Sequence, residues 1–187
     1  LYTATGTRSN GANSYLGYFD LATGAVTTVG GPLGVGYMTS LEFAPNGTLY
    51  GGSFGGPDTY GTDNYLYTID TATGTPTLVG NLAFEGVMDF AFDSSGTLWA
   101  VGISGTSDSA LYTINLATGA GTYVRDITGA FTVMGIMFDS SGTLYATDHG
   151  SPSLLYRIDI STGAATTVGD TGIMMSHGGD ISLVPGQ

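Results

Sequence analysis

Two histidines with nearby carboxylates are the side chains best placed for chemistry. His149 follows Asp148, and His177 lies three residues before Asp180. An imidazole beside a carboxylate is a common pair for general acid–base catalysis. No nucleophile motif and no zinc-type ligand spacing accompanies these histidines. We therefore expect exposed loop histidines and no enzyme activity, with a lyase or hydrolase as the least favoured alternative.

A second group of oxygen-bearing side chains lies in a long segment predicted as a loop over 51–64. Asp58, Asp63 and Asn64 supply oxygen atoms there, and Ca²⁺ takes six to eight such ligands. No Asp-x-Asp-x-Asp-Gly loop occurs in the chain. Solvated turn residues are the favoured interpretation, and a Ca²⁺ site at Asp58 and Asp63 is the alternative. No other cofactor is expected.

Two further polar positions follow from comparing segments of the chain. Asp89 and Asp180 are at equivalent places near the start of a predicted strand, where two carboxylates can share a cation or water. Hydrogen bonds to neighbouring loop amides are the favoured interpretation. Asn46-Gly47-Thr48 is a glycosylation sequon on a predicted turn. The turn alone explains these residues, so a glycan at Asn46 is the weaker hypothesis.

Methionines and aromatic residues recur at regular places, and we interpret both sets as packing residues. A methionine precedes or opens each predicted inner strand, which indicates an apolar collar or, alternatively, an adaptable binding rim. The four are Met38, Met88, Met134 and Met174. The aromatic residues that end equivalent strands are Tyr50, Trp99 and Tyr145.

The charge balance excludes some classes of partner. Three arginines and no lysine face fifteen carboxylates, giving a formal charge of −12. Such a chain repels phosphate backbones, so nucleic acid is not an expected partner. No apolar stretch approaches the ~20 residues of a membrane helix, so no membrane span is expected in this segment. With no cysteine, disulfides and thiolate metal sites are excluded.

Two motifs alternate along the chain and define its organisation. The first is Phe43-Ala-Pro-Asn-Gly-Thr-Leu-Tyr50, repeated at 92–99 and 138–145. The second is Leu66-Tyr-Thr-Ile-Asp-Thr-Ala-Thr-Gly74, repeated at 111–119 and 155–163 and, in variant form, at 16–24. The glycines that end the second motif are 50, 45 and 44 positions apart. This period is typical of the four-stranded blades of β-propellers.

The repeats predict an all-β, four-bladed β-propeller formed by a single domain over 1–187. Each blade has four antiparallel strands, linked by hairpins whose Asp, Asn, Thr and Gly residues suit tight turns. Three blades span 37–81, 87–127 and 133–170. The remaining blade combines 178–187 with 1–31, so that a C-terminal strand joins three N-terminal strands and closes the ring. A fragment of a longer propeller is the alternative.

The recurring Leu-Tyr-x-Ile-Asp-x-x-Thr-Gly strand and turn resembles bacterial secreted and surface propellers of the NHL-like and YVTN-like repeat groups. The resemblance implies an extracellular or cell-surface location and carries no catalytic signature. The uniform turns, the lack of a catalytic motif and of lysine, and the incomplete terminal blade favour a structural or adhesive module, including a self-assembling surface-layer or filament subunit. Its partner would be another copy of itself or a surface glycan or protein. A calcium-dependent carbohydrate or peptide binder is the second hypothesis. Its ligands would bind the rim residues Asp58, Asp63, Asn64, Asp89, Asp148, His149, His177 and Asp180.

Overall fold

The computed structural model describes residues 2–6, 14–56, 59–104 and 109–174. These residues form fifteen strands and no helix, and therefore include no helix able to cross a membrane. The chain divides into two compact units, one of residues 1–87 with 115–120 and the other of 88–114 with 121–187. Each unit is described by itself below.

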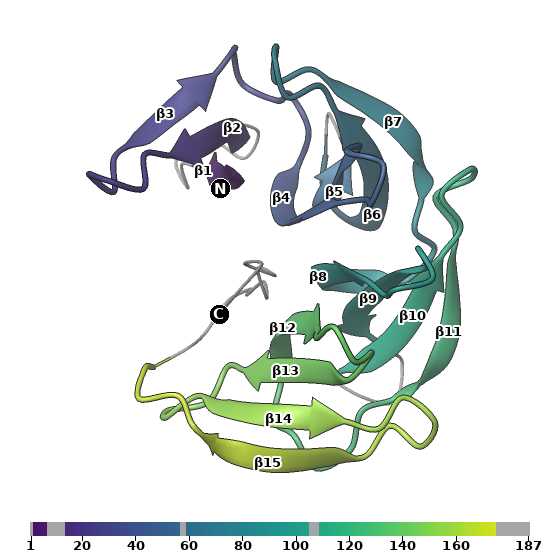
Figure 1. The fold of residues 1–187 in the computed structure, drawn as a ribbon. Helices are drawn as coiled ribbons and strands as arrows, with labels where there is room; N and C mark the ends of the chain where they lie inside the picture. Colours follow the sequence, from purple (N-terminus) through teal and green to yellow (C-terminus); the bar gives the residue numbers. More distant parts are fainter. Residues whose placement is uncertain (1, 7–13, 57–58, 105–108, 175–187) are drawn as a thin grey trace. The chain divides into compact units, whose positions relative to one another are not determined.

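The strands pair into four antiparallel sheets in chain order, traced from purple to yellow in Figure 1. Sheet 1 contains β1 (Tyr2–Gly6), β2 (Ser14–Phe19) and β3 (Val26–Val29). Sheet 2 contains β4 (Tyr37–Phe43), β5 (Leu49–Gly56), β6 (Thr59–Ile69) and β7 (Pro76–Asn81). Sheet 3 contains β8 (Glu85–Phe92), β9 (Leu98–Ile103), β10 (Ala110–Ile114) and β11 (Gly121–Asp126). Sheet 4 contains β12 (Val133–Phe138), β13 (Leu144–Asp148), β14 (Leu154–Ile158) and β15 (Ala165–Asp170).

The predicted closing strand over 178–187 lies outside the described residues, so sheet 1 is described with three strands. One local expectation is wrong. The segment 51–64 is not an open loop, because β5 continues to Gly56 and β6 begins at Thr59. Its Thr and Tyr residues favour extended backbone, and pairing the strands satisfies the backbone polar groups that a long loop leaves to water.

The turns of the second motif share one hydrogen-bond pattern. In the last of them, Asp159 Oδ1 accepts bonds from the Ser161 hydroxyl (2.6 Å) and amide (2.8 Å). These bonds favour the ionised carboxyl and hold the pKa of Asp159 below its ordinary value. The Gly163 amide donates to the Asp159 carbonyl, and Gly163 has a positive φ of 77°, which suits glycine. Residues 20–24, 70–74 and 115–119 repeat this turn.

Apolar cores form beside these sheets in each unit. In the first unit, Leu16, Val35, Met38 and Leu49 pack together among the most buried side chains. In the second unit a larger cluster joins strands of sheets 3 and 4, and its buried members are Ala91, Val101, Leu111, Ile127, Val133, Ile136, Leu144, Ala146, Tyr156 and Ile158. The packing role expected for Met38 is therefore confirmed.

A buried polar side chain links each of three sheets to the sheet that follows it. Ser14 Oγ accepts a bond from the Met38 amide (3.1 Å), and Ser109 Oγ accepts one from the Val133 amide (2.7 Å). Asn64 occupies the same place in the repeat, and its Oδ1 lies 3.4 Å from the Val87 amide. We call these residues, together with the equivalent Ser153, the acceptor positions. All four are buried.

The backbone at the acceptor positions makes a second repeated bond. The carbonyls of Ser14, Asn64 and Ser109 each accept an amide from the segment that leaves the same sheet, at 2.8 Å. The amide of Thr171 donates to the Ser153 carbonyl in the same way, at 3.0 Å. Each acceptor position therefore fixes the connection that leaves its own sheet, and three of them also fix the first strand of the next.

Replacing Ser109 with alanine tests this role. The change leaves the buried Val133 amide without its acceptor, which costs about 1–3 kcal/mol of unfolding free energy. Urea unfolding should show this loss. The exposed turn residue Ser140 offers a matched Ser140→Ala control, expected to stay within about 0.5 kcal/mol of the parent. Equal midpoints for the two variants would contradict the assigned role.

Candidate functional site

The segment 148–153, which joins β13 to β14, brings together the candidate residues of the second unit; we call it the rim loop. It begins at Asp148, whose side chain is only 2% exposed. Asp148 Oδ1 accepts bonds from the amides of Leu154 (2.8 Å) and Gly150 (3.2 Å). Its Oδ2 accepts a bond from the Tyr156 hydroxyl (2.9 Å). The carboxylate is therefore used to hold the loop that contains it.

The pKa of Tyr156 reflects the burial of its hydroxyl beside the Asp148 carboxylate. Burial raises the pKa of Tyr156 above its ordinary value, and the hydrogen bond to Asp148 and the negative charge of that carboxylate raise it further. The phenol therefore stays protonated through the neutral range and serves as a donor to the carboxylate. This arrangement is suited to anchoring a loop.

Backbone bonds tie the rim loop to segments on either side of it. The His149 amide donates to the Thr132 carbonyl (2.8 Å), in the connection from sheet 3 to sheet 4. The Ser153 amide donates to the Ile173 carbonyl (3.0 Å), and the Ser153 hydroxyl donates back to the Asp148 carbonyl (2.8 Å). The loop is therefore fixed at both ends.

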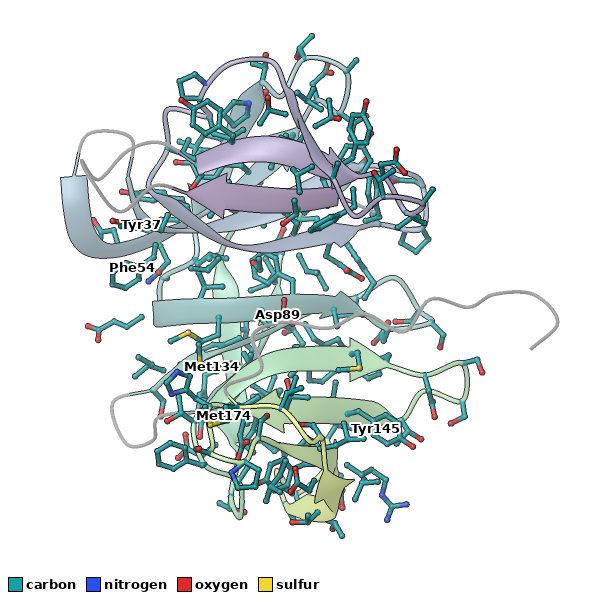
Figure 2. The ribbon with its side chains drawn as sticks, turned by 90° about the vertical axis from the view of Figure 1, so that its left-hand side faces the viewer. Tyr37, Phe54, Asp89, Met134, Tyr145 and Met174 are labelled. Carbon is teal, nitrogen blue, oxygen red and sulfur yellow. The ribbon has the colours of Figure 1, made fainter. Side chains whose placement is uncertain are left out.

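Large apolar side chains are exposed on the two segments that the rim loop bridges. Phe131 is 62% exposed, Ile173 is 55% exposed and Met174 is 70% exposed. The Ser151 hydroxyl contacts the Met174 sulfur at 3.3 Å, which places that side chain against the rim loop. Figure 2 labels Met174, together with Met134. We call Phe131, Ile173 and Met174 the rim apolar residues. Sequence reasoning assigned Met174 to a packed collar, and its exposure corrects that assignment.

The other methionines of the predicted collar differ in their surroundings. Met38 is buried in the core of the first unit. Met88 is half-buried and packs against the core of the second. Met134 is also half-buried and lies where the pairing of β12 with β13 shifts by one residue. Equivalent positions in the repeat therefore do not place these methionine side chains in equivalent surroundings.

Asp63 and Asn64 are neighbours in β6, where successive side chains point to opposite faces of the sheet. Asp63 is exposed and Asn64 is fully buried. Asn64 Nδ2 donates to the Phe84 carbonyl at 2.7 Å, and its Oδ1 faces the Val87 amide. The structure therefore gives Asn64 a bonding role inside the first unit. Asp58 lies outside the described residues.

Asp89, labelled in Figure 2, is buried in β8. Its Oδ2 accepts a bond from the Ile136 amide of β12 at 2.9 Å. This bond connects the first strands of sheets 3 and 4, two elements of one unit. Its proposed counterpart Asp180 and the second histidine, His177, lie outside the described residues.

Asn46 is exposed at the turn between β4 and β5, and its Oδ1 accepts a bond from the Thr48 amide at 3.0 Å. The sequon therefore forms the side-chain-capped turn that sequence reasoning assigned to it. Among the described residues, no three His, Cys, Asp or Glu side chains gather closely enough to hold a metal ion. Calcium binding stays a prediction.

Sequence reasoning missed the acceptor positions. Their signal is present in the sequence, because Ser14, Asn64, Ser109 and Ser153 recur at the same spacing as the motif glycines. Each lies two residues before the leucine of its strand, and each is small or amide-bearing and polar. A polar side chain that recurs at the same position of every repeat is expected to form a hydrogen bond with the backbone of its own or the next repeat.

Comparison with known proteins identifies the fold. No protein-family model matches the chain, and no curated protein matches its sequence. Among solved structures, the chain is similar to the crystal structure of a nidogen/laminin complex, with a TM-score of 0.62 and 13% identity over 90% of this chain and 63% of that one. It is also similar to TolB from Acinetobacter baumannii, with a TM-score of 0.58 and 16% identity over 92% and 41%.

A third structure, the PQQ-bound aldose sugar dehydrogenase of Streptomyces coelicolor, gives a TM-score of 0.58 and 16% identity over 97% of this chain and 72% of that one. The chain spans less than two thirds of the first two proteins. These neighbours are β-propellers with varied functions, including binding proteins and enzymes. The all-β class and the four-bladed β-propeller fold predicted from the repeats are confirmed.

Replacing Tyr156 with phenylalanine tests the anchoring of the rim loop. Removing the hydroxyl takes a bond from the buried Asp148 carboxylate, which costs about 1–3 kcal/mol of unfolding free energy at neutral pH. Because folding raises the pKa of Tyr156, its contribution is present below the pKa of an unfolded tyrosine, about 10, and is lost as the pH rises through the folded value. The parent should therefore lose stability above pH ~10 more steeply than the variant.

Urea unfolding between neutral and alkaline pH measures both effects. Burial also raises the pKa of Tyr67. Its ionisation therefore contributes part of the loss of stability at alkaline pH in both the parent and the variant. The half-exposed Tyr123 provides a matched Tyr123→Phe control, expected to resemble the parent. Identical pH profiles for parent and Tyr156→Phe would contradict the anchoring role.

Proposed function

We propose that this chain is a non-enzymatic structural or adhesive module that acts outside the cell. The observation that carries the proposal is the bonding of the rim carboxylate: Asp148 accepts two amides and one hydroxyl. A general base needs a lone pair directed at the substrate proton. An acid enclosed by donors from its own loop is better suited to rigidity than to proton transfer.

The rim apolar residues supply a surface for a protein partner. Exposed apolar residues grouped on fixed backbone are typical of interaction sites, and rigid loops lose little conformational entropy on binding. One neighbouring structure is a complex of nidogen with laminin, which supports the use of this fold in protein contacts. The sugar dehydrogenase holds PQQ, so the same fold also serves an enzyme, and function must be argued from the site.

The charge of the chain narrows the choice of partner. At −12 it repels nucleic acids and anionic lipid surfaces, and it attracts basic partners. A basic region of a surface protein fits this restriction directly, and an uncharged surface glycan is not repelled. A second copy of the chain carries the same charge, so its association is favoured only as added salt screens the repulsion. The resemblance to secreted and surface propellers supports the extracellular location.

Thermal unfolding with Ca²⁺ or with a chelator distinguishes this proposal from the calcium-dependent binder. A ligand that binds only the folded chain raises the melting temperature. We expect equal melting temperatures in millimolar Ca²⁺ and in EDTA. A rise of several degrees that is lost in Asp63→Asn would favour the binder; Glu85→Gln, at an exposed position of β8, is the matched control.

The same preparation tests for catalysis with two probes, an aldose with PQQ and a simple aryl ester. We expect no turnover above buffer. Turnover that disappears in a His149→Ala, His177→Ala double variant would replace the proposal with the enzyme alternative.

Surface location is measured by protease treatment of intact source cells. Because the proposal places the chain outside the cell, its antibody signal should fall while a cytoplasmic marker remains. Loss of the antibody signal only after the cells are lysed would contradict the extracellular location. This result would not bear on catalysis, which the turnover assay tests.

A further inference from the structure

One cross-strand pair of sheet 1 departs from the pattern of the repeat. At the equivalent place in sheets 2 and 3, an aromatic residue lies opposite a half-buried threonine. These pairs are Tyr50 with Thr68 and Trp99 with Thr113. In sheet 1 both members are aromatic, because Tyr2 lies opposite Tyr18. The threonine in the other sheets shows that the repeat does not need a large ring at this place.

Tyr2 takes part in a second contact, which the repeat does use. Its ring centroid lies 5.5 Å from that of Phe43 in β4. The equivalent rings of the second unit, Trp99 and Phe138, lie 6.1 Å apart. This contact packs one sheet against the next. Tyr18 adds a third ring, 6.3 Å from Tyr2 between centroids. We call Tyr2, Tyr18 and Phe43 the aromatic cluster.

The aromatic cluster is open to solvent and complete within the first unit. Tyr18 is 42% exposed, Phe43 is 41% exposed and Tyr2 is half-buried. All three rings come from sheets 1 and 2, and they lie where these two sheets of one unit contact each other. Exposed aromatic side chains grouped on strands are a surface suited to binding.

The geometry of the rings favours a compact cation over a flat ligand. The rings of Tyr18 and Phe43 are each inclined by 62° to the ring of Tyr2. Rings inclined in this way form walls and do not form the flat platform on which a sugar ring stacks. A cation is attracted to the negative face of an aromatic ring within about 6 Å of its centroid. An ammonium or guanidinium group therefore suits the cluster.

The charge of the first unit favours the same kind of ligand. Its sequence contains one cation, Arg8, against six carboxylates. The carboxylates are Asp20, Glu42, Asp58, Asp63, Asp70 and Glu85. Asp20 is exposed and follows Tyr18 by two residues. Bonds from the amides of Ala22 and Thr23 hold the pKa of Asp20 below its ordinary value, so this carboxylate is charged at neutral pH.

Sheet 4 uses the same place for a cation from the chain itself. The pair equivalent to Tyr2 and Tyr18 is there Tyr145 and Arg157. Side chains directly opposite each other on one face of a sheet are within reach of each other. The repeat therefore places a guanidinium group opposite a tyrosine in one sheet. In sheet 1, where Tyr18 replaces the arginine, a partner can supply the cation.

We infer that the aromatic cluster binds an arginine or lysine side chain from a basic segment of a partner protein. The inference rests on the proposed adhesive role and names the chemistry of the partner. The cationic group contacts the exposed rings of Tyr18 and Phe43, and the negative charge of the unit adds attraction. Because the cluster is open to water, added salt should weaken this binding.

Fluorine NMR of protein labelled with 3-fluorotyrosine tests the site with a blocked tetra-arginine peptide. The Tyr18 resonance, identified by its absence from a Tyr18→Thr variant, should shift as peptide is added and reach a limit. The same peptide with citrulline in place of arginine has nearly the same shape without the charge, and it should cause no shift. A Tyr18 resonance that does not move with tetra-arginine, or that moves equally with both peptides, would overturn the inference.

Calorimetry on the unlabelled proteins separates the effect of the ring from that of net charge. Tyr18→Thr keeps the charge of the chain and should stay folded, because Thr68 and Thr113 occupy the equivalent place. Its Kd for tetra-arginine should rise about two- to five-fold, the effect of one cation–π contact at an exposed site.

Tyr123→Thr is the matched control for the affinity measurement. Tyr123 is 52% exposed and also lies beside a second tyrosine, Tyr112, with 5.9 Å between ring centroids. Tyr112 is buried, so this pair exposes one ring only. The control should bind tetra-arginine like the parent. Equal Kd values for the parent, Tyr18→Thr and Tyr123→Thr would show attraction by net charge alone and would overturn the site.

A neutral glycan is the competing occupant, and cellopentaose serves as its probe. We expect cellopentaose to leave the Tyr18 resonance unmoved. A shift with cellopentaose and none with tetra-arginine would overturn the cationic partner. The failures of the two proposals are distinguishable. A chain that ignores tetra-arginine and shows no turnover keeps the structural or adhesive role and loses this site, whereas a chain that turns over a probe loses the role whatever the cluster binds.

Discussion

The fold depends on one hydrogen bond made repeatedly between consecutive sheets. A buried serine or asparagine, two residues before the first leucine of the second motif, accepts an amide from the first strand of the next sheet, as Ser14 does from Met38. Sheets packed only by apolar side chains can slide with little penalty, because hydrophobic contact is not directional. A buried amide that loses its acceptor costs free energy, so these bonds fix how neighbouring sheets meet.

Within each unit, the turn of one sheet also lies against the outer strand of the sheet before it, as Gly74 does against Val29, and this contact adds a second constraint. At two of these junctions, Gly30 with Gly74 and Gly80 with Gly119, glycines on both sides let two backbones approach more closely than a side chain permits. The two kinds of contact together hold neighbouring sheets through different pairs of segments. A chain without disulfides can in this way keep its loops in fixed positions.

That rigidity bears on function through the rim loop. Its buried carboxylate, its tyrosine partner and its backbone bonds stabilise a platform beside which Phe131, Ile173 and Met174 are exposed. Asp148, which sequence reasoning placed beside a histidine for catalysis, is thus bonded within the structure of its own loop. A binding or assembly role fits this distribution of polar and apolar groups, and it fits a fold whose neighbours include both binding proteins and enzymes.

The sequence by itself determined the turns, most of the strands and the four-blade fold, because periodic leucines, turn aspartates and positive-φ glycines act through local geometry. It did not reveal that β5 and β6 extend into 51–64. The roles of the buried polar residues were decided only by the tertiary structure. Asp63 and Asn64 are adjacent and chemically similar, yet one is exposed and the other bonds inside the unit. Gly24 and Gly74 end the same motif and differ in burial. Burial and bonding partners come from segments distant in the chain, and no local pattern encodes them.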